Sequence, residues 1–151
     1  MSAKTAVMQY GLLLGVLNGS FAQTSWATSA GSTSVWIGLH TADPGEACST
    51  ANEGGYTAYT RAQTDRSTAG TTPYGWSVSS GSSEATAAPV GNVDFPQVAT
   101  TTTGTFSYFS LWPTSGATST QAYYYGALSP AINFGQNTTP RITTSSSLTE
   151  A

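Results

Sequence analysis

The sequence predicts a mainly β protein: a single antiparallel β-sandwich or a partly closed, tulip-like barrel, with one N-terminal helix. The first observation is composition, because the 151 residues include 21 Ser and 26 Thr but only 7% charged residues, and β-branched Thr favours strands. The second is the presence of 8 Tyr, 5 Phe and 4 Trp, which disordered Ser-rich chains lack. The third is a series of short alternating segments separated by Gly, Pro and Ser, a pattern typical of sandwiches and barrels.

The N-terminal segment has helical spacing. Apolar side chains recur on one helical face at Val7, Tyr10, Leu14 and Leu17. This pattern predicts a helix over residues 5–17, ended by the Asn-Gly pair that follows. Residues 19–34 are mostly small and polar and predict a linker. We therefore divide the chain into an N-terminal helix and linker arm, residues 1–33, and a β domain, residues 34–151.

Alternation and turn residues predict six or seven short strands. The expected strands cover residues 35–40, 56–64, 76–80, 91–95, 105–112, 121–128 and 141–148. The residues expected in the core include Val35, Ile37, Leu39, Val93, Phe95 and Phe109. The strand at 105–112 carries large residues on both faces, so another sheet, the helix or another subunit must cover its second face.

Charge and ligand content exclude several functions. The basic residues are Lys4, Arg61, Arg66 and Arg141, and the net charge is −3. A nucleic acid partner is not expected, because phosphate binding needs a clustered basic patch. One cysteine and one histidine allow neither an internal disulfide nor a four-ligand zinc site. The apolar stretch at residues 11–17 is too short to span a membrane, so no membrane partner is expected.

A short group of possible metal ligands follows the first strand. His40, Asp43 and Glu46, with Glu53 nearby, combine imidazole and carboxylate ligands that suit a divalent cation. A solvated turn, in which Asp43 caps the Pro-Gly bend, explains the same residues more simply. We therefore expect no metal and no cofactor.

The sequence contains few residues that could form a catalytic site. A Ser/His/Asp triad would have to use His40, the only histidine, and the sequence contains no Gly-x-Ser-x-Gly elbow. A dyad of Cys48 and His40, eight residues apart, is conceivable, but a lone cysteine is more often inert. We expect no catalytic residue and no enzymatic activity.

The aromatic residues allow two interpretations. Trp36, Trp76, Trp112 and the run Tyr123–Tyr125 would bind sugars if they formed an exposed platform. We favour the other interpretation, a core and a subunit interface, where Tyr and Trp are enriched. The residues expected to contact other subunits are Tyr10, Leu13, Leu14, Leu17, Trp36, Trp112, Tyr123 and Tyr124.

Residues 35–47, VWIGLHTADPGEA, resemble the opening of a family of tailed-phage virion proteins. In that family a strand ending in Leu-His/Tyr-Thr leads into Asp-Pro, and an Asn-Glu, a glycine pair and a Tyr-x-Arg follow. The matching residues here are Asn52-Glu53, Gly54-Gly55 and Tyr59-Thr60-Arg61, with later similarities at Asn92–Pro96 and Tyr125–Leu128. The resemblance runs in order over most of residues 5–148. Cys48 stands where the family usually has glycine.

The resemblance implies a capsid decoration, or cement, protein, from a family whose members are often labelled minor tail or tail-fibre proteins. Such a protein would bind the major capsid protein on the outer surface of the virion head as a homotrimer and stabilise the shell by mass action and avidity. Two alternatives stay open. One is a structural component of a phage tail or fibre. The other is a secreted bacterial carbohydrate-binding module, because the N-terminal segment outlines a short signal peptide.

Overall fold

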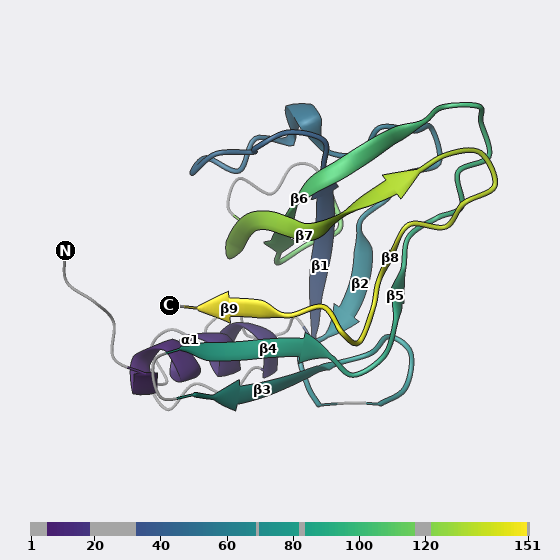
Figure 1. Ribbon diagram of the computed structural model, residues 1–151. Helices are drawn as coiled ribbons and strands as arrows, with labels where there is room; N and C mark the ends of the chain where they lie inside the picture. The colour runs from purple at the N-terminus through teal and green to yellow at the C-terminus, as the bar shows by residue number, and fades with distance from the viewer. Residues whose placement is uncertain (1–5, 19–32, 69, 82–83, 117–121, 151) are drawn as a thin grey trace. The chain divides into compact units, whose positions relative to one another are not determined.

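The computed structural model describes residues 6–18, 33–68, 70–81, 84–116 and 122–150. As predicted, the fold is mainly β, with antiparallel sheets and one short N-terminal helix; its described strands form no closed barrel (Figure 1). The elements are α1 (Ala6–Asn18), β1 (Ser34–His40), the 3-10 turn η1 (Thr50–Asn52), β2 (Ala62–Asp65), β3 (Trp76–Ser80), β4 (Ala85–Pro89), β5 (Val93–Asp94), β6 (Gly104–Trp112), β7 (Tyr124–Phe134), β8 (Arg141–Ile142) and β9 (Leu148–Glu150).

The described strands form sheets of the orders β2-β1-β6-β7, β3-β4-β9 and β5-β8. Contacts within the chain divide it into two compact units. Unit 1 comprises Met1–Val35, Thr64–Val93 and Ile142–Ala151, and unit 2 comprises Trp36–Gln63 and Asp94–Arg141. Strands β1, β2, β5 and β8 each continue from one unit into the other.

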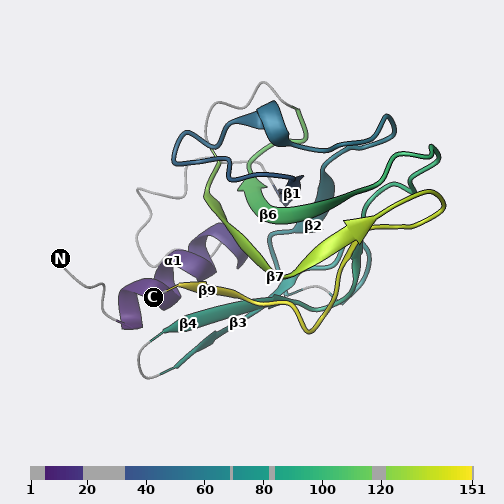
Figure 2. The ribbon, with the colours of Figure 1, turned by 45° about the horizontal axis from the view of Figure 1, so that its top comes forward.

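Unit 1 is built on helix α1, which packs against β3 and β4 and touches β9 (Figure 1, Figure 2). Leu13 and Leu17, one helical turn apart, are fully buried, and so are the small Ala85 and Ala87 of β4. Leu14, expected on the same face as Leu17, is only half-buried. Among the described residues, no helix is long and apolar enough to cross a membrane.

An arginine that directly follows β2, in unit 1, binds the C-terminal end of α1. Arg66 donates from Nε to the carbonyl of Val16 (2.9 Å) and from Nη2 to the carbonyl of Gly15 (2.6 Å). The last carbonyls of a helix have no partner within the helix and carry partial negative charge. The guanidinium therefore satisfies and neutralises this helix end, in a sequence where Gly11 and Gly15 weaken the helix itself.

Unit 2 is built on β6, which pairs antiparallel with β1 on one side and β7 on the other. Directly paired residues share a face of the sheet. One face carries the pairs Trp36–Trp112, Gly38–Ser110 and His40–Tyr108, and the other carries Ile37–Leu111 and Leu39–Phe109. The alternation of side chains along β1 therefore determines which residues of β1 and β6 lie side by side on each face.

Aromatic rings fill the core of unit 2. Phe106 and Phe134 stack with centroids 4.5 Å apart, and Tyr59 stacks on Phe95 at 6.1 Å. The Tyr56 ring contacts both Phe106 and Phe134, and its hydroxyl donates to the carbonyl of Pro96 at 2.7 Å. The core therefore combines β6 and β7 with the loop that follows η1.

Five of the six predicted core residues are buried: Val35, Ile37, Leu39, Val93 and Phe95. The prediction for Phe109 is wrong, because its side chain is only half-buried. The β6–β7 register shifts between Phe106 and Tyr108, and the Phe109 ring then lies over Gly126 of the edge strand, 3.1 Å from where a Cβ would be. A glycine on an edge strand leaves that ring partly open to solvent.

The strand expected at residues 56–64 is also wrong in part. Only β2, Ala62–Asp65, is a strand, because the Tyr59 N–H donates to the carbonyl of Tyr56 at 3.1 Å and closes a turn. The expected strand at 141–148 is interrupted by a similar turn, from Ser146 N–H to the carbonyl of Thr143. Strand β4 was not predicted, since its sequence ATAAP carries little β propensity.

Candidate functional site

A buried polar cluster lies in unit 2, where the loop of residues 41–61 returns to β1. Thr41 N–H donates to the carbonyl of Asn52 (3.0 Å), and Gly54 N–H donates to the carbonyl of Leu39 (2.9 Å). These bonds bring Glu53 opposite His40 in an isolated antiparallel bridge. We call this group the His40 cluster; it consists of His40, Cys48, Glu53, Tyr59, Arg61, Ser110 and Trp112.

Glycines make room for this cluster. A Cβ on Gly38 would lie 2.7 Å from Ser110 Oγ, 2.9 Å from Glu53 Oε1 and 3.1 Å from Trp112 Nε1, all closer than side-chain packing tolerates. Gly54 has a φ of +77°, and a Cβ there would lie 2.7 Å from the Tyr59 ring. The glycine-pair motif and the glycine in β1 are thus required by close approach and by backbone conformation.

Ser110 joins two of the rings in the cluster. His40 Nε2 lies 2.7 Å from Ser110 Oγ, and Trp112 Nε1 donates to the same oxygen at 2.6 Å. His40, Ser110 and Trp112 are each at most 1% exposed. Burial holds the pKa of His40 below its ordinary value; the Glu53 carboxylate opposes this effect and Arg61 adds to it.

The Cys48 thiol lies beside the same serine. Burial raises the pKa of Cys48, and a hydrogen bond with Ser110 opposes that shift. Cys48 has a φ of +49°, a left-handed conformation that favours glycine. This backbone geometry agrees with the expectation that glycine is the usual residue at this position.

Glu53 and Arg61 form a buried ion pair. Arg61 donates from Nε to Glu53 Oε1 (2.6 Å) and from Nη2 to Glu53 Oε2 (2.7 Å), while both side chains are less than one-tenth exposed. The remaining nitrogen, Nη1, donates to the carbonyls of Gly116 (2.9 Å) and Thr114 (3.3 Å). Arg61 therefore holds the segment after β6 against the loop that carries Glu53.

Tyr59 completes the cluster from the side of the core. Its hydroxyl accepts from the backbone N–H of Leu39 (2.7 Å) and lies 3.4 Å from Glu53 Oε1. Burial raises the pKa of Tyr59 far above its usual range. A neutral phenol at this position satisfies a strand N–H that the sheet does not reach.

The geometry does not support nucleophilic catalysis. The Ser110–His40 hydrogen bond is of the kind that joins a nucleophile to its base, but a triad needs a third group on His40 Nδ1. That nitrogen has no hydrogen-bond partner among the described residues, and both carboxylate oxygens of Glu53 are held by Arg61. The complete burial of Ser110 and His40 also denies access to a substrate.

The residues considered as metal ligands are not gathered into a site. Asp43 and Glu46 are exposed whereas His40 is buried, and Asp43 Oδ1 accepts from the Gly45 N–H at 2.8 Å. This bond is the turn cap that the Asp-Pro-Gly sequence predicts. In the described part of the chain, no group of three His, Cys, Asp or Glu residues is placed to hold a metal ion.

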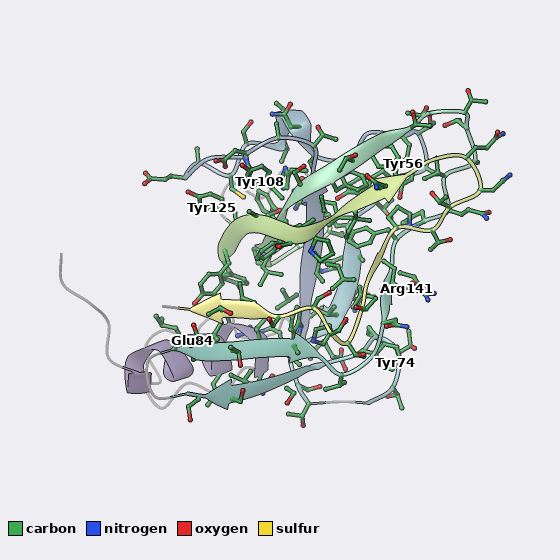
Figure 3. The ribbon with its side chains drawn as sticks, viewed as in Figure 1. Tyr56, Tyr74, Glu84, Tyr108, Tyr125 and Arg141 are labelled. Atoms are coloured by element: carbon green, nitrogen blue, oxygen red, sulfur yellow. The ribbon has the colours of Figure 1, made fainter. Side chains whose placement is uncertain are left out.

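The residues expected to contact other subunits are distributed over both units. Leu13, Leu17 and Trp112 are buried within the chain itself. Leu14, Trp36, Tyr123 and Tyr124 keep part of their surface accessible, and the side chain of Tyr10 is outside the described residues. Tyr125, absent from that expectation, is the most exposed large aromatic residue among those described, at 39%; it projects near Tyr108 (Figure 3).

Sequence reasoning missed most of the His40 cluster. The sequence places Glu53 and Arg61 in motifs and offers Cys48 and His40 as a possible dyad, but it predicts neither the ion pair nor the central Ser110. Ser110 is 70 residues from His40 in sequence, and only the β1–β6 register brings them together. An Arg in an otherwise weakly charged chain, near an acidic residue, was the one available signal.

Comparison with known families gives a match over most of the chain. The family described as "Podophage GP4 fiber I protein gp80" matches residues 14–149. No curated protein matches the chain.

This match corrects the expected function. A capsid decoration subunit on the outer surface of the head is wrong, because the matching family is one of fibre proteins. The alternative, a structural fibre component of a phage virion, is supported, and the expectation of no enzymatic activity is confirmed. Low charge and β structure are common to both kinds of virion protein, so composition did not separate them.

Proposed function

Because the chain belongs to the podophage GP4 fibre I protein gp80 family, we propose that it is a fibre subunit that assembles with copies of itself as a trimer. The observation that carries its placement in a fibre is the family match over residues 14–149. The trimer is what the resemblance of residues 35–47 to tailed-phage virion proteins implies, and the low charge of the chain and an uncharged edge strand support contacts between copies. The subunit performs a mechanical role, and its specificity lies in which surfaces it joins.

Charge supports an interface that is mainly uncharged. The chain has four basic and seven acidic residues in total, and two of its arginines, Arg61 and Arg66, are engaged within the chain. Exposed ion pairs contribute only about 0–1 kcal/mol each. Apolar burial and main-chain pairing are therefore the available sources of affinity between copies.

Strand β7 offers such a surface. It lies at the edge of its sheet, and its eleven residues include no charged side chain. Natural edge strands usually avoid pairing by means of charges, proline or bulges. In β7 both Pro130 and the register shift fall between Ala127 and Ile132, so they leave the regular stretch Tyr124–Ala127 unprotected. We infer that this stretch, with Trp36 and Tyr123, contacts a neighbouring copy.

Native mass spectrometry of the full chain tests the trimer, at about 0.15 M and about 1 M salt. The trimer should persist at the higher salt, because screening weakens charge contacts and leaves apolar burial intact. A chain that stays monomeric at tens of micromolar would contradict the assembly. Localisation of the chain in intact particles by cryo-electron microscopy tests the fibre assignment separately, and density on the head shell alone would contradict it.

Charged substitutions test the edge. Tyr125→Glu and Ala127→Glu place carboxylates at exposed positions of β7 and should shift the chain toward monomer. Thr57→Glu, also exposed and also in unit 2, is the matched control and should leave the trimer intact. If the β7 variants assemble like the control, the contact lies elsewhere.

A further inference from the structure

We propose that His40 is an acid-sensitive latch of unit 2: neutral, it helps hold the loop of residues 41–61 against β1 and β6, and protonated, it releases that loop. The inference goes beyond the role of the chain in a fibre. It depends on the hydrogen bonds and the charges around one fully buried imidazole.

The hydrogen bonds around His40 select one neutral form. Ser110 Oγ already accepts from Trp112 Nε1 and lies beside the Cys48 thiol. If His40 carries its proton on Nε2, that N–H donates to Ser110 Oγ, and the serine hydroxyl is free to donate to sulfur. Nδ1 is then a bare acceptor, and an unpaired buried acceptor is tolerated better than an unpaired buried N–H.

Protonation of His40 adds a buried donor that these hydrogen bonds do not satisfy. An imidazolium has two N–H donors, and the second, on Nδ1, meets no acceptor among the described residues. His40 is 0% exposed, so bulk solvent does not reach the ring in the folded state. A buried charged donor without a partner is among the most destabilising groups in a protein core.

The neighbouring charges do not compensate. Glu53 is the nearby carboxylate, but the guanidinium of Arg61 occupies both of its oxygens, and Arg61 itself repels a second cation. Cys48 and Tyr59 face the same cluster as neutral groups because burial raises the pKa of each. Across the sheet, His40 is paired with Tyr108 of β6.

The direction of the pH effect follows from burial. An unfolded histidine binds a proton below a pKa of about 6.5, whereas burial lowers the pKa of His40 in the folded chain. The unfolded state therefore takes up the proton first as pH falls. Stability is fully present above about pH 6.5 and decreases below it, by up to about tenfold in the opening equilibrium per pH unit.

The effect is confined to unit 2. His40 is the only histidine in the chain, and every residue of the His40 cluster belongs to unit 2. Its release frees the loop of residues 41–61, and with it the Arg61 contacts to the carbonyls of Thr114 and Gly116. Unit 1, with α1, β3 and β4, contains no residue of this cluster.

Hydrogen exchange of the full chain between pH 8 and pH 5, corrected for intrinsic rates, tests the latch. Amides of residues 36–61 and 104–116 should lose protection by roughly tenfold or more between pH 6.5 and pH 5. Amides of β3 and β4 in unit 1 should change by less than about twofold over that range. Equal loss in both units, or no loss in unit 2, would overturn the proposal.

A variant and a spectroscopic titration separate His40 from the carboxylates. His40→Gln keeps a neutral N–H donor for Ser110 and should flatten the pH dependence of unit 2. An unchanged dependence would show that His40 is not its source and overturn the proposal. If this variant does not fold, NMR titration of the single imidazole of the wild-type chain still tests the proposal. Its midpoint should lie below about 6.5 and coincide with the loss of protection, and a midpoint at or above that value would refute the latch.

Discussion

The guanidinium of Arg61 lies over the ring of Trp112, with its central carbon 3.8 Å from the ring centroid, while the same group makes two hydrogen bonds to Glu53. Stacking covers the flat face of the cation, and hydrogen bonds satisfy its edge. This arrangement lets a full positive charge be 5% exposed in a protein with few charges. Three segments of unit 2 therefore depend on one side chain.

Removal of either partner of the buried pair should destabilise unit 2 strongly. Arg61→Met leaves the Glu53 carboxylate buried without its cation, and Glu53→Gln leaves the guanidinium without its anion. Each should lower the free energy of unfolding by about 3–5 kcal/mol, measured by urea denaturation. Arg61→Lys should restore only part of the loss, because an ammonium neither forks to both oxygens nor stacks on Trp112 in the same way.

The matched control is the exposed pair of Arg141 and Asp94. Arg141 donates from Nη2 to Asp94 Oδ2 at 2.9 Å, and both side chains are 47% exposed; Figure 3 shows Arg141 projecting outward. Arg141→Met should leave the urea midpoint unchanged within error, because solvent screens exposed pairs. A loss as large as that of Arg61→Met would show that burial is not the deciding factor.

Gly38→Ala should destabilise the fold although alanine suits a strand better than glycine does. The added methyl would meet Ser110 Oγ, Glu53 Oε1 and Trp112 Nε1 at 2.7–3.1 Å, and overpacking of this kind costs about 1–3 kcal/mol. Thermal unfolding measures the effect. Gly70→Ala, where an added Cβ meets no heavy atom of the described residues within 4 Å, should change the melting temperature little.

The first strand could be predicted because the information is local. Val35, Ile37 and Leu39 alternate with Trp36, Gly38 and His40, and every second residue of a strand faces the same side. Alternation fails to predict the burial of Phe109, because the β6–β7 register shifts between Phe106 and Tyr108. That shift depends on β7, which lies outside the segment that contains Phe109. Alternation fails again at residues 56–59, where the aromatic side chains fill the core from a turn.

The His40 cluster was less predictable, for a related reason. Gly54-Gly55 and the Asp-Pro-Gly sequence predict turns, but they do not indicate which strand the chain packs against after each turn. Ser110 enters the cluster only through its register with Gly38, and neither residue has a chemically distinctive sequence context. Long-range register, which a single sequence does not record, accounts for what was missed.

Arg66→Ala should loosen helix α1 in unit 1. The substitution removes the donors that bind the carbonyls of Gly15 and Val16, and loss of a cation at a helix C-terminus costs about 0.3–2 kcal/mol. Far-ultraviolet circular dichroism, together with hydrogen exchange of residues 12–18, measures the change. Arg66→Lys, which keeps the charge, should lose less, and equal losses would assign the effect to the hydrogen bonds alone.

Cys48 should react slowly with thiol reagents in the folded chain. The side chain is 5% exposed, and burial raises the pKa of its thiol, so little thiolate forms at pH 7 and reagents cannot approach it. Ellman's reagent at pH 7 should therefore modify Cys48 at least roughly tenfold more slowly than a free thiol, and urea that unfolds unit 2 should remove the difference. The control combines Cys48→Ser with Ala47→Cys, which moves the thiol to an exposed neighbour and should give the ordinary rate. If native Cys48 reacts as fast as this control, the loop that carries it is open in solution, and the closed His40 cluster is not its resting state.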